Sequence, residues 1–249
     1  MRWIILALLL LAGCERISSS SPGGKAFQHA VTATTIYERK ENLNLALQEL
    51  LNAPSDASVY RNTAKVFQLL GETPWAIYYT YKAMKLEPRN HQLEEELDKG
   101  IAVASLPERV KENPFGPLIR WHQILSQGEK FQLLFVGLVA LFILTSVWIW
   151  QGSKVLRIPI LLLGLLCALM ASSLLYSRYG EPLEGILVAP AALYREPDAK
   201  ALLVKDSPLP AGLKLEVLDE RDEGRWLKVK TDQGEYGYVR YQPIRLITP

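Results

Sequence analysis

Two uncharged stretches of twenty residues constrain this chain more than any other feature of its sequence. "FQLLFVGLVALFILTSVWIW" covers residues 131–150, and "IPILLLGLLCALMASSLLYS" covers residues 158–177. At about 1.5 Å of rise per residue, each is long enough to cross roughly 30 Å of hydrocarbon as a helix. Neither has the polar face that a surface helix of a soluble protein shows. We therefore predict two transmembrane helices.

The connection between the two spans is short, residues 151–157, so we expect an antiparallel helical hairpin. It carries Lys154 and Arg157 and no acidic residue, which by the positive-inside tendency places it in the cytoplasm. We interpret the small residues of the spans as ordinary membrane-helix composition, although such residues can let helices pack closely. They are Gly137, Ala140, Gly164 and Ala168.

The first thirteen residues, 1–13, have the organisation of a secretory signal: a basic start at Arg2, an apolar run and small residues. The "LAGC" that ends at Cys14 resembles a bacterial lipobox. This resemblance implies cleavage before Cys14 and attachment of a diacylglyceryl group to its thiol. Residues 14–24 would then be a flexible tether. The alternative is an uncleaved signal in which Cys14 has no role.

Residues 25–104 have helical spacing, most clearly between positions 57 and 90. We expect Gly71 to end one helix there, Pro74 to lie near the start of the next, and Pro88 to close it. The recurring apolar or small residues are Tyr60, Ala64, Phe67 and Leu70, then Ala76, Tyr79, Ala83 and Leu86.

This unit resembles a tetratricopeptide repeat, whose period is about 34 residues. Residues 25–53 look like a degenerate copy, and a third helix from Asn90 to about Ala104 would cap the stack. The resemblance implies that the domain binds peptides or proteins in a groove. By register, that groove would be basic and suited to an acidic segment; the alternative is an ordinary solvated helix face. The residues concerned are Arg61, Lys65 and Gln68.

Residues 105–130 link this domain to the first span. Three prolines make the first half stiff, and apolar residues then repeat at helical spacing. We interpret the second half as a short amphipathic helix on the membrane surface. Its apolar residues are Leu118, Trp121, Ile124 and Leu125.

The C-terminal region, residues 186–249, changes to short strands: "GILVA", "ALLVKD", "LKLEVLDE", "RWLKVKT", "EYGYVR" and "IRLI". Glu223-Gly224 and Gln233-Gly234 have the chemistry of hairpin turns. Five or six short strands in about sixty residues predict a small β-barrel.

The order of motifs in this region resembles bacterial SH3-like domains: "LYREP" from position 193, "PAG" from 210, "WLKV" from 226 and "GYV" from 237. We expect Trp226 and Tyr238 to lie in the core. Tyr194 and Tyr241 are the candidate ligand-binding residues of the barrel.

The whole chain is predicted to be a multi-domain membrane protein. An all-α domain of tetratricopeptide-like helical repeats comes first, then a transmembrane helical hairpin, then a C-terminal all-β SH3-like barrel. This order resembles the TPR–SH3 membrane proteins (BatE type) of bacterial aerotolerance operons. The resemblance implies a cell-envelope protein of the cytoplasmic (inner) membrane. Its partners would be von Willebrand factor A-type proteins and an AAA-type ATPase of the same membrane complex.

No catalytic or metal-binding pattern is evident in the sequence. His29, His91 and His122 are scattered without metal-ligand spacing, and we expect no metal and no cofactor. A formal net charge of only +2 argues against nucleic acid as a partner. Glu181 and Glu184 leave open a small hydrolase, on the weak evidence of one carboxylate pair.

We therefore predict a non-enzymatic, membrane-anchored scaffold with both modules in the periplasm. An exported N-terminus requires the same orientation as the basic hairpin loop, so two independent signals agree. The alternative is a cell-wall sensor whose SH3-like domain binds peptidoglycan.

Overall fold

The structure is a computed structural model, and it describes residues 26–27, 29–30, 33–107 and 125–247. Three predictions fall wholly or largely outside these residues. They are the signal peptide over residues 1–13, the lipid-bearing Cys14 with its tether over residues 14–24, and the amphipathic helix within residues 105–130.

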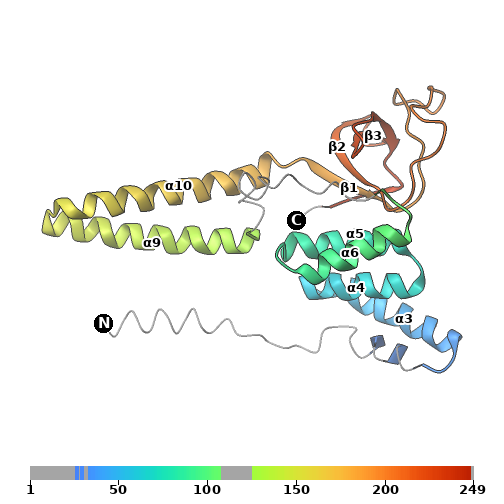
Figure 1. Cartoon of the computed structure of the whole chain (residues 1–249), viewed down its shortest axis with the longest axis horizontal. Helices are drawn as coiled ribbons and strands as arrows, with labels where there is room; N and C mark the ends of the chain where they lie inside the picture. Colours follow the sequence, from blue (N-terminus) through green and yellow to red (C-terminus); the bar gives the residue numbers. More distant parts are fainter. Residues whose placement is uncertain (1–25, 28, 31–32, 108–124, 248–249) are drawn as a thin grey trace.

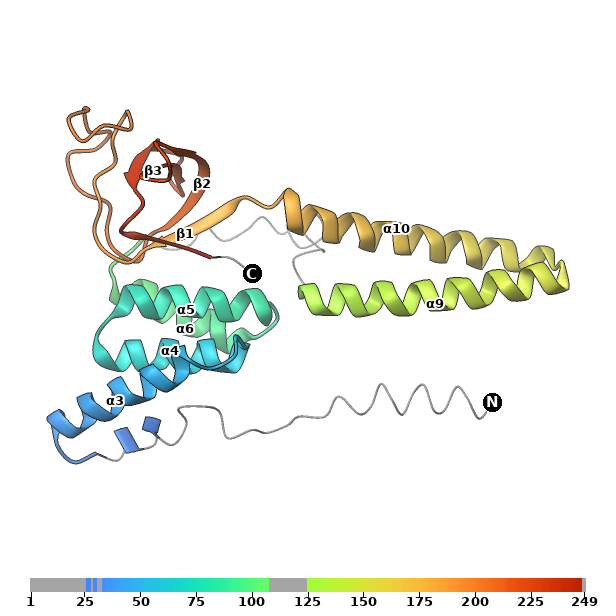
Figure 2. The ribbon, with the colours of Figure 1, turned by 180° about the vertical axis from the view of Figure 1, so that it is seen from behind.

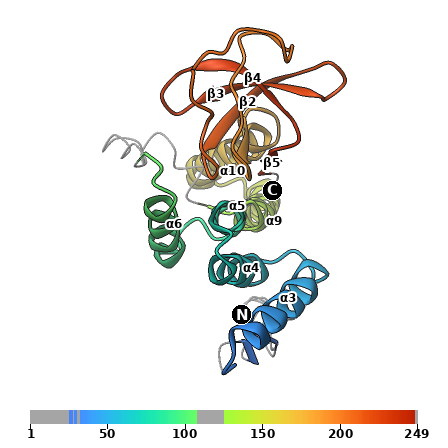
Figure 3. The ribbon, with the colours of Figure 1, turned by 90° about the vertical axis from the view of Figure 1, so that its right-hand side faces the viewer.

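Four helices form a stack at the N-terminal side of the described chain (Figure 1). They are α3 (Ile36–Leu51), α4 (Ala57–Leu70), α5 (Thr73–Leu86) and α6 (His91–Val103). Viewed roughly along the axes of α4 and α5, α5 lies nearest the sheet, α4 lies beneath α5, and α3 lies farthest away (Figure 3). Three small or branched residues of α4 and α5 are buried within the stack: Ala64, Val66 and Ala83.

The helix ends have the local chemistry that the sequence predicts. Gly71 ends α4 in the left-handed conformation, with φ of 81°, where its amide donates to the Gln68 carbonyl. Pro74 lies in the first turn of α5, where a missing N–H leaves no bond unmade. Asn90 caps α6, because its side-chain oxygen accepts from the Gln92 amide.

Two long apolar helices, α9 (Gln127–Gln151) and α10 (Arg157–Tyr179), run antiparallel side by side and project away from the rest of the molecule (Figures 1 and 2). A short 3₁₀ turn, η1 (Lys154–Leu156), joins them. Both are long and apolar enough to cross a membrane, and almost none of their apolar surface is buried within the chain. A core helix of a soluble protein would be mostly buried.

One small residue of the hairpin does have a packing role, contrary to our interpretation of its composition. A Cβ atom placed on Gly137 would lie 2.8 Å from the Cys167 Sγ. Gly137 therefore marks a close approach of α9 and α10, and Cys167 is buried there with a free thiol. Gly164, by contrast, faces open space.

The C-terminal region is a five-stranded antiparallel sheet in the order β4-β3-β2-β1-β5. The two predicted hairpin turns are confirmed, with Gly224 and Gly234 at positive φ. The strands are β1 (Leu183–Leu187), β2 (Lys214–Arg221), β3 (Trp226–Thr231), β4 (Tyr236–Arg240) and β5 (Ile244–Leu246).

The sheet differs from the predicted barrel in two respects. It is strongly curled, but its edge strands β4 and β5 do not pair with each other among the described residues, so the sheet is not closed. The predicted strand "ALLVKD" is wrong. Residues 202–204 make only an isolated bridge to residues 193–195, with Arg195 donating to the Leu202 carbonyl.

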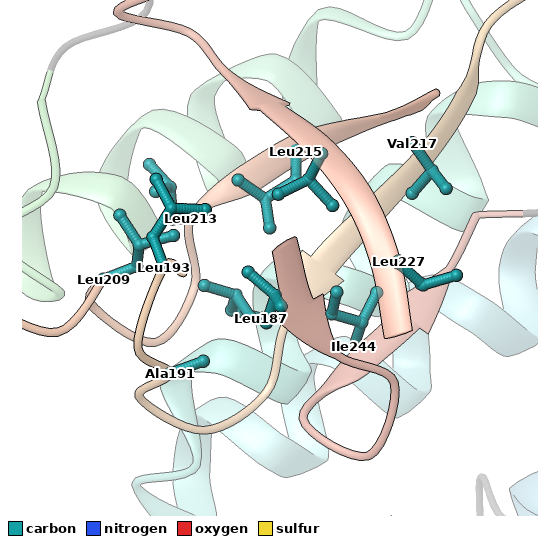
Figure 4. Packing of buried hydrophobic residues seen from close by; sticks show 11 residues of the cluster. Leu187, Ala191, Leu193, Leu209, Leu213, Leu215, Val217, Leu227 and Ile244 are labelled. Atoms are coloured by element: carbon teal, nitrogen blue, oxygen red, sulfur yellow. The ribbon is translucent and has the colours of Figure 1, made fainter. Parts of the chain in front are cut away.

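Strand β1 is buried on both faces, which joins the sheet to the helices. Successive side chains of a strand point to opposite faces. Leu187 therefore enters the interior of the curled sheet (Figure 4), while Ile186 points the other way, into a cluster with Ile77 of α5 and Leu97 of α6. Both β1 residues have no exposed surface. We call the helical stack and the sheet together the body.

Candidate functional site

A cavity of about 380 Å³ lies between α4, α5 and α6. Small side chains and glycines supply much of its wall, because larger residues would fill the space between the helices. Three of its lining residues, Gln68, Gly71 and Val103, are exposed. The lining residues on α4, α5 and α6 and the α4–α5 turn are Ala64, Lys65, Gln68, Gly71, Thr73, Ala76, Ile77, Thr80, Glu96, Gly100 and Val103.

The structure brings together two of the three residues that the sequence assigns to a groove. Lys65 and Gln68 line the cavity, whereas Arg61, one helical turn earlier on α4, is not among the lining residues. Sequence reasoning missed Glu96 of α6, whose carboxylate lies 3.5 Å from the Lys65 ammonium across the cavity. Glu96 therefore offsets the positive charge that the sequence pattern on α4 alone suggests.

The floor of the cavity offers a ligand few free polar groups. The Thr80 hydroxyl donates to the Ala76 carbonyl of its own helix at 2.8 Å, so that hydroxyl is already bonded. Ile77 supplies aliphatic surface and is only 2 % exposed, because its other atoms belong to the cluster that joins the helices to the sheet. The cavity is therefore apolar at its base and bears one ion pair of opposite charges at its wall.

An aromatic cluster covers α4 and α5 outside the cavity. Phe67 stacks on Trp75 and on Tyr79, with ring centroids 5.6 and 5.5 Å apart. Burial raises the pKa of Tyr79 to about 12, because a buried tyrosinate would lose hydration. Lys82 lies over the Tyr60 ring and Arg245 of β5 lies over Trp75. These half-buried rings are packed on one another or covered by cations, so they form a partly exposed aromatic surface of α4 and α5.

The two candidate ligand residues of the sheet lie in different surroundings. Tyr194 is half-buried, and its ring meets the Trp226 ring edge-on at 5.3 Å. Tyr241 is 45 % exposed, and its amide donates to the Arg225 carbonyl. Both therefore lie next to the start of β3. Trp226 is buried, but it is not part of the core cluster: it lies on the opposite face of β3 from the core residue Leu227 and is covered partly by Arg240. The prediction that Tyr238 lies in the core is wrong, because Tyr238 is only half-buried and points away from the core residue Val239.

The two carboxylates that the sequence offered for hydrolysis are held in ion pairs. Glu181 pairs with Lys85 at 3.5 Å and accepts a hydrogen bond from Ser177 at 3.2 Å. Glu184 lies 3.6 Å from the same Lys85 and 2.8 Å from Lys214. Each carboxylate is thus engaged with at least one lysine at the boundary between helices and sheet.

Within the part of the chain that the structure describes, no group of three or more His, Cys, Asp or Glu residues is placed to hold a metal ion. Comparison with known protein families, with curated proteins and with solved structures finds no match to this chain. Geometry and sequence pattern therefore carry the functional argument.

Proposed function

We propose that this protein is a non-enzymatic scaffold, anchored in a membrane, that holds a segment of a partner protein in the cavity between α4, α5 and α6. The observation that carries this proposal is the cavity itself. Its volume of about 380 Å³ lies within the range of small-ligand sites, and a groove between helices can take an extended or helical segment.

The chemistry of the wall indicates what kind of segment fits. Small residues and Ile77 favour aliphatic side chains at the base. On binding, Lys65 and Glu96 would separate, and each would contact a group of opposite charge on the segment. We therefore expect an apolar segment with polar flanks in place of the purely acidic segment that the α4 pattern suggests.

The membrane setting of this proposal rests on the sequence and on the two apolar helices. Lys154 and Arg157 favour a cytoplasmic turn, which leaves the body in the periplasm of a bacterial inner membrane. Cys14 would add a lipid anchor. The helical stack would be tetratricopeptide-like and the sheet SH3-like. The partners would be proteins of the kinds encoded in aerotolerance operons. Binding at one membrane site would raise their effective concentration for one another.

Site-specific photo-crosslinking in cells tests the proposal. A photoreactive phenylalanine analogue at Gln68, which lines the cavity, should give a discrete adduct with a partner protein. The same analogue at Leu69, which is 54 % exposed but does not line the cavity, is the matched control. Introducing Val103→Trp to fill the cavity should abolish the Gln68 adduct. Equal adducts at both positions, or an adduct that survives Val103→Trp, would contradict the proposal.

The wall-sensor alternative has one supporting observation, the exposure of Tyr241, whose backbone is bonded to Arg225 next to the start of β3. Aromatic rings of this kind can stack on sugars. If the sheet binds peptidoglycan there, the full-length protein should sediment with purified wall material, and Tyr241→Ala should reduce that fraction. Sedimentation that is unaffected by Tyr241→Ala would remove this site.

A further inference from the structure

The body and the hairpin meet at a joint formed by charged residues. On the body, Lys85 lies at the end of α5 and Arg89 lies in the turn that follows. On the hairpin side, Glu129 lies in the first turn of α9 and Glu181 follows the end of α10. Lys85 pairs with Glu181 at 3.5 Å, and Arg89 pairs with Glu129.

Glu181 is held from the hairpin side as well. Its second carboxylate oxygen accepts from the Ser177 hydroxyl at 3.2 Å. The Ser177 hydroxyl in turn accepts from the buried ammonium of Lys130 on α9, at 2.9 Å. A continuous polar chain therefore runs from Lys130 through Ser177 and Glu181 to Lys85.

Among the described residues, no cluster of buried apolar side chains reinforces this joint. The three clusters of buried apolar residues in the described part of the chain contain no residue of α9 or α10. The side chains of the Lys85–Glu181 pair are 34 % and 23 % exposed, and those of Arg89 and Glu129 are more exposed. Solvent and salt therefore weaken the attraction at the joint far more than they weaken apolar contacts.

The covalent link on this side is short and lies at the joint itself. Only residues 180–182 separate the end of α10 from the start of β1. Rotation of the body against the hairpin would thus occur about Glu181. After such a rotation Lys85 would keep its contact with Glu184, and Glu181 would keep its bond from Ser177. Lys85 would thus keep a carboxylate partner and Glu181 would keep one hydrogen bond, which lowers the cost of breaking the pair between them.

We propose that the Lys85–Glu181 and Arg89–Glu129 pairs form a releasable ionic latch, and that the body docks on the hairpin and leaves it as one rigid unit. The latch sets the orientation in which the cavity is presented above the membrane. This inference depends on the hairpin and the joint alone and holds whether or not a peptide occupies the cavity.

Pulsed electron-spin distance measurements on the full-length protein in lipid nanodiscs test the latch. Spin-labelled unnatural amino acids avoid the native cysteines. One pair of labels, at Gln92 on α6 and Val155 in the hairpin turn, spans the joint; both positions are exposed. A second pair, at Gln92 and Gln233 in the β3–β4 turn, lies within the body.

We expect the Gln92–Val155 distance distribution to be narrow at low salt and to become roughly twofold broader at about 1 M salt, where screening extends only a few ångströms. Lys85→Glu should broaden it at low salt, and Lys85→Arg should not, because arginine keeps the charge. Lys230→Glu, which breaks a Lys–Glu pair within the sheet, is the matched control and should leave it narrow. The Gln92–Gln233 distribution should stay narrow throughout.

Two results would overturn the proposal. If the Gln92–Val155 distribution does not respond to salt or to Lys85→Glu, the joint is rigid. If the Gln92–Gln233 distribution broadens together with it, the body is not a unit and the change reflects loss of folding. The photo-crosslinking of the cavity is a separate measurement, so failure of the latch and failure of the scaffold proposal are distinguishable.

Discussion

Helix α5 takes part in two junctions of opposite character. Along its length it packs against the sheet through Ile77 and the fully buried Ile186. At its end it meets the hairpin through the partly exposed Lys85 and Glu181. Burial of apolar area gives a strong, salt-insensitive contact, whereas exposed ion pairs contribute little. The helices and the sheet therefore move as one unit relative to the hairpin, although they lie on either side of the hairpin in the sequence.

The largest expected effect comes from the apolar junction. Ile186→Ala removes a fully buried side chain between β1 and the helices and should lower the free energy of unfolding by about 2–4 kcal/mol. Leu218→Ala is the control, because Leu218 is 44 % exposed and should change stability little. Denaturant unfolding of the detergent-solubilised protein measures both. A loss of less than about 1 kcal/mol for Ile186→Ala would show that the two modules do not share a core.

Two glycines of the hairpin allow the contact between α9 and α10 to be tested independently of the body. Gly137→Leu should push α9 away from α10 and destabilise their contact by about 1–3 kcal/mol, because the Cys167 Sγ occupies the space for a side chain. Gly164→Leu faces open space and should be tolerated. Thermal unfolding in detergent measures the difference. Equal behaviour of the two variants would mean that the helices do not meet at Gly137.

The aromatic cluster gives a smaller, pH-dependent effect. Burial raises the pKa of Tyr79 from the ordinary tyrosine value of 10.0 to about 12, so the unfolded state loses this proton first. Stability from this residue is complete below pH 10 and declines as the pH rises toward 12. The slope is at most about 1.4 kcal/mol per pH unit, and solvent around the half-buried ring reduces it.

Unfolding at about pH 9 and pH 11 checks this effect of Tyr79. The Tyr79→Phe protein should lose less stability between the two values than the parent protein does. An identical loss in both proteins would show that Tyr79 titrates normally and that the cluster is open to solvent.

Loss of the charge on Lys85 should affect stability least. Lys85→Gln should change the free energy of unfolding by no more than about 1 kcal/mol, because its partners are partly exposed. It should nevertheless alter the orientation of body and hairpin in the spin-label measurement. A stability loss as large as that of Ile186→Ala would mean that the joint is part of the core and not a latch.

Much of the local structure could be predicted from the sequence. Gly71 ends α4, and Glu223-Gly224 and Gln233-Gly234 form turns, because glycine backbone conformation is a local property. The uncharged spans predict α9 and α10 to within a few residues, because a long apolar run carries its own signal. The extra strand "ALLVKD" was wrong, since apolar alternation by itself does not supply a neighbouring strand with which to pair.

The candidate site could be predicted only in part. Lys65 and Gln68 follow from helical register on α4, and the structure places both at the cavity. Glu96 could not be assigned, because its distance from Lys65 depends on how α6 packs across α5. The pairing of Glu181 and Glu184 with Lys85 could not be predicted for the same reason, because nearly one hundred positions separate the partners in the sequence.

The helical segments, the apolar hairpin and most of the strands follow from local patterns, because periodicity and turn chemistry act over a few neighbouring residues. Long-range packing places Ile186 in one cluster with Ile77. Among the described residues, it also leaves β4 and β5 unpaired and joins the body to the hairpin through ion pairs instead of a buried apolar cluster. These features depend on contacts between distant residues, which local patterns do not encode.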